Sequence, residues 1–135
     1  MLASPCAIIS ASDAGAHLQM FCAAGDTTLV LTRHVRERGD LTLEGAIWEL
    51  SGRQAGLFGF KDRGKIAVGT HADLTVFNLD ELEWLPDVRV EDLPGGGARL
   101  LRPPGGYRYT IVGGVVTQDH GKATGNFPGS FLSAG

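Results

Sequence analysis

The spacing of apolar residues changes at Lys61, and this change constrains the fold more than any other feature of the sequence. Before it, apolar residues recur three or four positions apart, as in Leu31 with Val35 and Ile47 with Leu50, which is the spacing of amphipathic helices. After it, short β-branched runs alternate with turns rich in glycine. A chain with helices in one half and strands in the other is expected to adopt an α+β fold.

Four segments are predicted before residue 61. A short apolar run at 6–10, which ends in small and polar residues, is typical of a central parallel strand and its carboxyl-end loop. A helix is expected over 27–38, with Gly39 directly after it. A second helix is expected to begin with Thr42 as its N-cap and to weaken at Gly52, and a short third helix is expected over 55–58.

The second half of the sequence predicts short strands joined by turns. Strands are expected over 66–68 and 73–77, and a hairpin is expected where two β-branched runs flank Gly113-Gly114. Residues 80–106 are dense in proline and glycine and are expected to form one long irregular loop.

Length, charge and cysteine content exclude several classes of protein. A chain of 135 residues predicts one domain and is too short for a complete (β/α)8 barrel, which takes about 250 residues. The net charge of −3 and the lack of a basic stripe argue against a nucleic-acid partner. No apolar run reaches the ~18 residues of a membrane span. The start of the sequence lacks the basic stretch of a signal peptide, so no signal peptide is expected. Two cysteines, Cys6 and Cys22, predict free thiols in a reducing, cytoplasmic setting.

Ser12 and Asp13, which follow the first predicted strand, are the sharpest candidates for a functional site. Sites in parallel α/β folds form at the carboxyl ends of strands, where a carboxylate can act as a general base or bind a metal. Spacing alone favours a simpler interpretation, in which Asp13 is solvated and caps a turn. His17 lies four residues after Asp13, but two side chains are too few for a zinc site.

The other candidate residues are interpreted as structural. Cys22 is expected to be a buried thiol. Surface positions are expected for the remaining histidines, His34, His71 and His120. The sequence contains no GxSxG, Walker A or GxGxxG motif, so no self-sufficient catalytic or phosphate-binding motif is present.

Several blocks in order resemble the end of N-acyl-D-amino-acid deacylases, the D-aminoacylase-like enzymes of the amidohydrolase superfamily. The blocks cover essentially the whole chain: SDAGAH at 12–17, VRERG at 35–39, LTLE at 41–44, FGFKDRGKIAVG at 58–69, ADLTVF at 72–77, VGGVV at 112–116, GKATG at 121–125 and Pro128-Gly129.

The resemblance implies a fold and a catalytic residue. Enzymes of this family have a metal-dependent (β/α)8 barrel beside a small β-sandwich built from both chain ends. Residues 1–60 would hold the last barrel strand, the Asp13 loop and the last helices, and residues 61–135 would hold C-terminal sandwich strands with the loop 80–106. Asp13 would match the family's catalytic carboxylate and touch the metal, which is zinc in the full-length family. It would take a proton from the metal-bound water and later give one to the leaving amine, with Ser12 and His17 beside the substrate.

The sequence also departs from the family pattern. The His-x-His of the first barrel strand, the bridging ligand and the histidines of the middle strands are absent. The chain is therefore similar to the final third of such an enzyme and is expected to bind no zinc alone. Smaller departures are Gly45 for an acidic residue, Gln54 for proline, Gly113 for asparagine and Ser130 for arginine.

Three hypotheses of function remain open. The chain is expected to be the C-terminal part of a metal-dependent amidohydrolase for N-acyl amino acids, inactive alone. Alternatively, it is a non-catalytic module that self-associates, most simply as a dimer with exchanged strands, because a lone barrel strand and uncovered helix faces need partners. The third hypothesis is a subunit that completes a barrel supplied by another chain.

Overall fold

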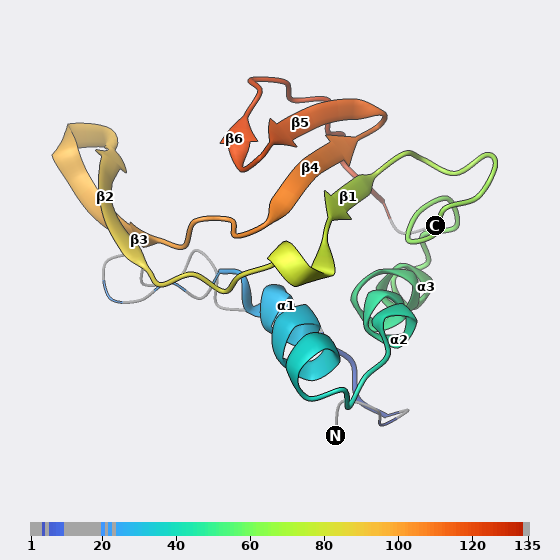
Figure 1. Ribbon diagram of the computed structural model, residues 1–135. Helices are drawn as coiled ribbons and strands as arrows, with labels where there is room; N and C mark the ends of the chain where they lie inside the picture. The colour runs from blue at the N-terminus through green and yellow to red at the C-terminus, as the bar shows by residue number, and fades with distance from the viewer. Residues whose placement is uncertain (1–3, 5, 10–19, 21, 23, 134–135) are drawn as a thin grey trace.

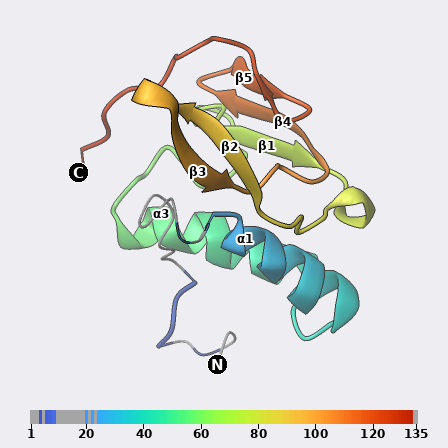
Figure 2. The ribbon, with the colours of Figure 1, turned by 90° about the vertical axis from the view of Figure 1, so that its left-hand side faces the viewer.

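A computed structural model describes residues 4, 6–9, 20, 22 and 24–133. Helices from the first half of the chain form one layer, and an antiparallel sheet from the second half lies above them (Figure 1). Figure 2 views the molecule from the side, with the helices below and the strands above. The mixed helical and strand architecture expected from the change of pattern at Lys61 is confirmed.

Two helical segments form the lower layer. The first is α1 (Asp26–Leu29) continued by η1 (Val30–Glu37), a π-helix, and it ends before Gly39, which has a φ of 63°. The second begins with Thr42, whose hydroxyl accepts a hydrogen bond from the Gly45 N–H at 3.1 Å. Both the predicted first helix and the predicted N-cap are therefore confirmed. None of the helices in the described part of the chain has both the length and the apolar content needed to span a bilayer.

The second helical segment does not weaken at Gly52, which differs from the sequence-based expectation. It runs without a break through α2 (Leu43–Ile47), η2 (Trp48–Gly52) and α3 (Arg53–Leu57). Gly52 is buried, and a Cβ at this position would overlap the ring of Trp48. The glycine therefore makes room for the tryptophan inside a continuous helix, and the chain turns only at Gly59, with a φ of 77°.

A four-stranded antiparallel sheet forms the upper layer, in the order β1-β4-β5-β6. Its strands are β1 (Leu74–Phe77), β4 (Tyr107–Val112), β5 (Val115–Asp119) and β6 (Lys122–Ala123). Gly113 and Gly114 join β4 to β5 with φ values of 55° and 82°, which is the conformation that a two-residue hairpin turn requires. The predicted hairpin and the predicted strand over 73–77 are confirmed.

Two predicted strands are absent from the described residues. Residues 7–9 belong to no strand, because the neighbouring parallel strands that such a segment needs are missing from this part of the chain. Residues 66–68 also pair with no strand, and Ile66 and Val68 are 89% and 107% exposed. β-branched residues favour a strand, but a strand forms only where its backbone can hydrogen-bond to a neighbouring strand.

The segment 80–106 is more regular than expected. It contains an antiparallel hairpin of β2 (Val88–Leu93) and β3 (Gly97–Leu101), joined through η4 (Pro94–Gly96). Figure 1 shows this hairpin apart from the four-stranded sheet. Of the prolines and glycines that indicate an irregular loop, Pro94, Gly95 and Gly96 form the turn between these two strands.

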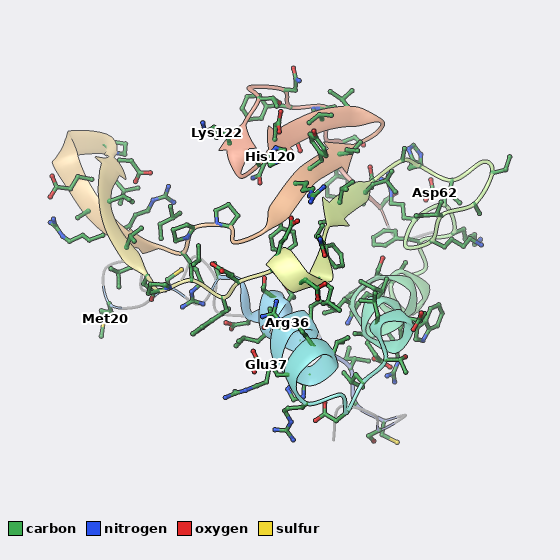
Figure 3. All side chains as sticks on the ribbon, in the orientation of Figure 1. Met20, Arg36, Glu37, Asp62, His120 and Lys122 are labelled. Atoms are coloured by element: carbon green, nitrogen blue, oxygen red, sulfur yellow. The ribbon has the colours of Figure 1, made fainter. Side chains whose placement is uncertain are left out.

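The core lies where the helices meet the segment that leads out of β1. Leu82, at the end of the short helix η3 (Leu79–Glu81), is fully buried and packs with Val30, Leu31 and Ala46. Arg36 Nη1 donates hydrogen bonds to the Leu79 carbonyl at 2.9 Å and to the Leu82 carbonyl at 2.6 Å. Figure 3 shows Arg36 on the helix beside this segment. Helix and sheet layers are thus joined through residues 79–82.

A pair of glycines tests this junction. Gly106 and Gly125 have φ values of 79° and 84°, but a Cβ at Gly106 would overlap the Glu81 carbonyl, whereas nothing lies within 4 Å of one at Gly125. We expect Gly106→Ala to lower the free energy of unfolding by about 2–4 kcal/mol, from backbone strain plus overpacking. Gly125→Ala should lose only the backbone part, about 1–2 kcal/mol. Equal losses in urea unfolding would show that the junction is not tightly packed.

Candidate functional site

The three predicted site residues, Ser12, Asp13 and His17, lie outside the described residues. Their predicted roles therefore stay predictions. The structure does describe chain on both sides of them, at residues 6–9 and at Cys22, Ala24 and Gly25. The contacts of these two segments are the part of the candidate site that can be built from geometry.

The segment before the predicted site is held by side chains of α3. Arg53 Nη1 donates to the Ala7 carbonyl at 2.7 Å, and Gln54 Nε2 donates to the Ile9 carbonyl. Arg53 also contacts the Glu49 carboxylate one turn earlier, at 2.8 and 2.9 Å. Ile9 packs against the main core cluster. The backbone acceptors of this segment are thus satisfied by side chains 45 and 46 residues away.

The segment after the predicted site is held by Arg102. Its Nη1 donates to the Ala24 carbonyl at 2.7 Å, and its Nη2 contacts the Cys22 carbonyl at 3.3 Å and Asp87 Oδ1 at 2.6 Å. The guanidinium carbon lies 3.8 Å from the ring centroid of Trp84, a cation–π distance. The Arg102 side chain is 8% exposed. Asp87 Oδ2 accepts a hydrogen bond from the Cys22 N–H at 3.4 Å. The Arg102 guanidinium and the Asp87 carboxylate therefore both bind the backbone of Cys22.

The remaining histidines lie apart from one another. Each is beside one carboxylate: His34 Nδ1 is 3.0 Å from Asp40, His71 Nε2 is 3.1 Å from Asp62, and His120 Nδ1 is 2.5 Å from Asp119. Figure 3 labels Asp62 and His120, which lie on separate loops. Among the described residues, no three His, Cys, Asp or Glu side chains gather closely enough to hold a metal ion. The described part of the chain therefore does not fit a complete metal centre.

A cleft of about 620 Å³ separates the helices from the sheet. Its apolar lining comes from both layers and includes Leu31, Leu50, Leu74 and Phe77. Ile66, which lies almost fully in solvent, is at its edge. Contiguous apolar surface of this kind is uncommon on an isolated soluble domain.

Two surface ion pairs perturb the pKa values of their carboxyl groups. A hydrogen bond from Arg108 lowers the pKa of Glu81, and Arg108 Nη2 lies 2.6 Å from Glu81 Oε1. Arg99 forms a two-pronged hydrogen bond with Asp92, at 2.7 and 2.6 Å, and lowers the pKa of that carboxyl. The first pair joins η3 to β4, and the second joins β2 to β3.

Comparison with known proteins decides the family. Residues 1–118 match the model described as the amidohydrolase family. The chain belongs to the amidohydrolase family. The match covers the helical layer and most of the sheet, so the family assignment applies to both parts of the fold.

Within the amidohydrolases, the chain is similar to D-aminoacylases. An N-acyl-D-glutamate deacylase of Alcaligenes xylosoxydans xylosoxydans is 44% identical over 69 residues, which are 51% of this chain and 14% of that enzyme. A D-aminoacylase mutant in complex with CuCl2 superposes with a TM-score of 0.60 at 26% identity, over 79% of this chain and 21% of that one. A D-aminoacylase studied for its binuclear metal centre has a TM-score of 0.55 at 25% identity, over 74% and 19%. The chain thus spans about a seventh to a fifth of these relatives, and the resemblance to D-aminoacylases seen in the sequence is confirmed.

Sequence reasoning missed the residues that hold the two segments. Arg102 precedes two prolines in the predicted loop, and Gln54 was noticed only as a departure from a family proline. Nothing in their local sequence indicates their carbonyl partners, which are 45 to 80 residues away.

The perturbed carboxyl groups predict how stability depends on pH. Their pKa values are lower in the folded than in the unfolded chain, so the stabilisation is present above the unfolded values, about 4, and is lost as pH falls through the folded values. We expect the urea midpoint to decrease between about pH 5 and pH 3. A Glu81→Gln, Asp92→Asn double variant should lose part of that decrease. An unchanged pH dependence in the double variant would mean that these pairs do not stabilise the fold.

Proposed function

We propose that this chain is the C-terminal part of a metal-dependent amidohydrolase that hydrolyses the amide bond of N-acyl amino acids. The match of residues 1–118 to the amidohydrolase family carries the proposal. The similarity to an N-acyl-D-glutamate deacylase favours D-configured substrates. The small share of each relative that the chain spans supports the view that it forms a complete site only with further protein.

The two layers fit two roles in such an enzyme. Residues 1–60 would contribute the end of a (β/α)8 barrel, with the helices 26–57 on its outside. Residues 61–135 would contribute strands to a small β-sandwich beside the barrel. The exposed side chains of Ile66 and Val68 need cover, and β1 is an edge strand among the described residues, so its outer side presents backbone groups that a further strand can pair with. Both features support this assignment.

Within this proposal, Asp13 is the catalytic carboxylate, at the edge of the metal site. It acts as a general base and then as a general acid, and Ser12 and His17 contact the substrate. The relatives' metal centres and copper complex support a metal ion in the complete enzyme, and we infer zinc. Because the described residues do not fit a metal centre, its other ligands belong to protein outside them. The two free cysteines favour the cytoplasm as the location.

A chimera tests this role for Asp13. The chain replaces the corresponding segment of the Alcaligenes N-acyl-D-glutamate deacylase, and hydrolysis of N-acyl-D-glutamate is measured. We expect the chimera to be active and the Asp13→Asn chimera to lose at least about a hundredfold in kcat, the usual contribution of general acid–base catalysis. Asp119→Asn, at the exposed end of β5, is the matched control and should leave kcat unchanged. A folded chimera that is inert, or one in which Asp13→Asn has no effect, would overturn the proposal. The purified chain alone should hydrolyse nothing.

Exposed apolar residues favour a second role, self-association of the chain when no barrel is present. Ile66, which lines the cleft, and Val68 are almost fully exposed, and another copy of the chain can cover them as the rest of an enzyme would. A strand-exchanged dimer would cover these apolar side chains and would also pair the edge strand β1. A partner chain that supplies the barrel would cover the same surface.

Solution mass tests the self-association. Light scattering of the purified chain should give twice 14.3 kDa. Changing Ile66 and Val68 together to serine should shift the mass to the monomer, because the surface that drives association is then polar. Phe127→Ser, at an equally exposed tail position, is the control and should remain dimeric. A monomer before any substitution would contradict the dimer.

A further inference from the structure

Four backbone carbonyls on two separate segments accept hydrogen bonds from long side chains of distant residues. Those of Ala7 and Ile9 accept from α3, and those of Cys22 and Ala24 accept from Arg102. Neither segment belongs to a strand of the described residues. Backbone carbonyls near a core normally accept hydrogen bonds from backbone N–H groups of secondary structure. In these two segments, side-chain N–H groups are the donors instead.

Arg102 is fixed in one orientation by its surroundings. Trp84 lies against the face of its guanidinium, and Asp87 accepts from one edge at 2.6 Å. A planar guanidinium held on two sides presents its remaining N–H groups in a fixed direction, which the single ammonium of lysine does not. Its bonds to the Cys22 and Ala24 carbonyls carry a charged donor, and such bonds are stronger than neutral ones.

The other segment is held from consecutive positions of one helix. Arg53 is oriented by Glu49 one turn earlier, in a part-buried ion pair with side chains 23% and 16% exposed. Gln54 follows directly and reaches the next-but-one carbonyl, that of Ile9. The contact with Ile9 depends on the side-chain amide N–H of Gln54, which is the donor.

We propose that Arg53, Gln54 and Arg102 are positioning residues that keep two segments, residues 6–9 and residues 22, 24 and 25, at a fixed separation. The residues between these segments include Asp13, so the inference rests on the proposed function for its consequence. The anchoring itself does not need that function. Arg53 and Gln54 act on residues 7 and 9 from the helical layer, and Arg102, directly after β3, acts on residues 22 and 24.

The two native cysteines make the separation measurable. Cys6 belongs to the first segment, Cys22 belongs to the second, and the chain has no other cysteine. Nitroxide labels on both thiols give a distance distribution by pulsed electron double resonance. Mixing labelled chain with an excess of unlabelled chain removes distances between copies, so that only the separation within one chain is measured.

Three variants are compared with the parent chain. Arg102→Ala removes the donor to the second segment, and Gln54→Glu keeps the size of residue 54 but removes its N–H donor. Arg99→Ala is the matched control, because Arg99 pairs with Asp92 inside the hairpin and contacts neither segment. We expect one narrow distance peak in the parent and in Arg99→Ala, and loss of that peak to a broad distribution in the other two.

Thermal unfolding followed by circular dichroism separates positioning from general stability. A residue that only stabilises the fold would lower the melting temperature and leave the folded molecules with the parent's narrow peak, which would overturn the proposal. A broad distribution in the parent would overturn it as well. If Arg102→Ala does not fold, Asp87→Asn replaces it, since that change frees the guanidinium on one side only. The measurement needs no substrate or metal, so a narrow parent peak that broadens in the variants supports the anchoring even if the chimera is inactive.

Discussion

The burial of Leu82 against the helices is the contact on which the rest of this structure depends. Residues 79–82 are the point where chain from the sheet crosses onto the helical layer, and Leu82 is fully buried there beside Val30, Leu31 and Ala46. Arg36 contacts two carbonyls of this crossing, and Gly106 packs against its backbone without room for a side chain. Removing a fully buried leucine typically costs about 2–5 kcal/mol, so this small core decides whether the two layers stay together.

The smallness of that core explains the rest of the surface. The cleft and the exposed side chains of Ile66 and Val68 leave apolar area in contact with water. That area contributes nothing to the hydrophobic stabilisation of the isolated chain. The proposed function gives a physical reason for this surface, since the chain spans about a seventh to a fifth of its deacylase and D-aminoacylase relatives. In the proposed enzyme, the barrel and sandwich cover what is exposed here.

Local signals in the sequence predicted the elements that depend on neighbouring residues alone. Thr42 was recognisable as a helix cap, and Gly113-Gly114 as a hairpin turn, because each acts within a few positions. The prediction of a strand over 66–68 is wrong, because a strand needs a pairing partner that local sequence does not reveal. The β2–β3 hairpin was hidden by Pro94 and its glycines, whose turn function is indistinguishable from that of an irregular loop. In the candidate site, the family resemblance indicates Asp13, which lies outside the described residues. The contacts of Gln54 and Arg102 depend on carbonyls that are distant in the sequence, so only the structure reveals them.

In the proposed function, this chain carries part of an amidohydrolase site and completes a metal centre only with further protein. Metal analysis of the purified chain by native mass spectrometry, after incubation with zinc and removal of the excess, tests this most directly. We expect a spectrum of metal-free chain, because the described residues bring no three ligands together. A stoichiometric zinc adduct, lost in an Asp13→Ala, His17→Ala variant, would contradict it by showing that the chain builds a metal site without further protein.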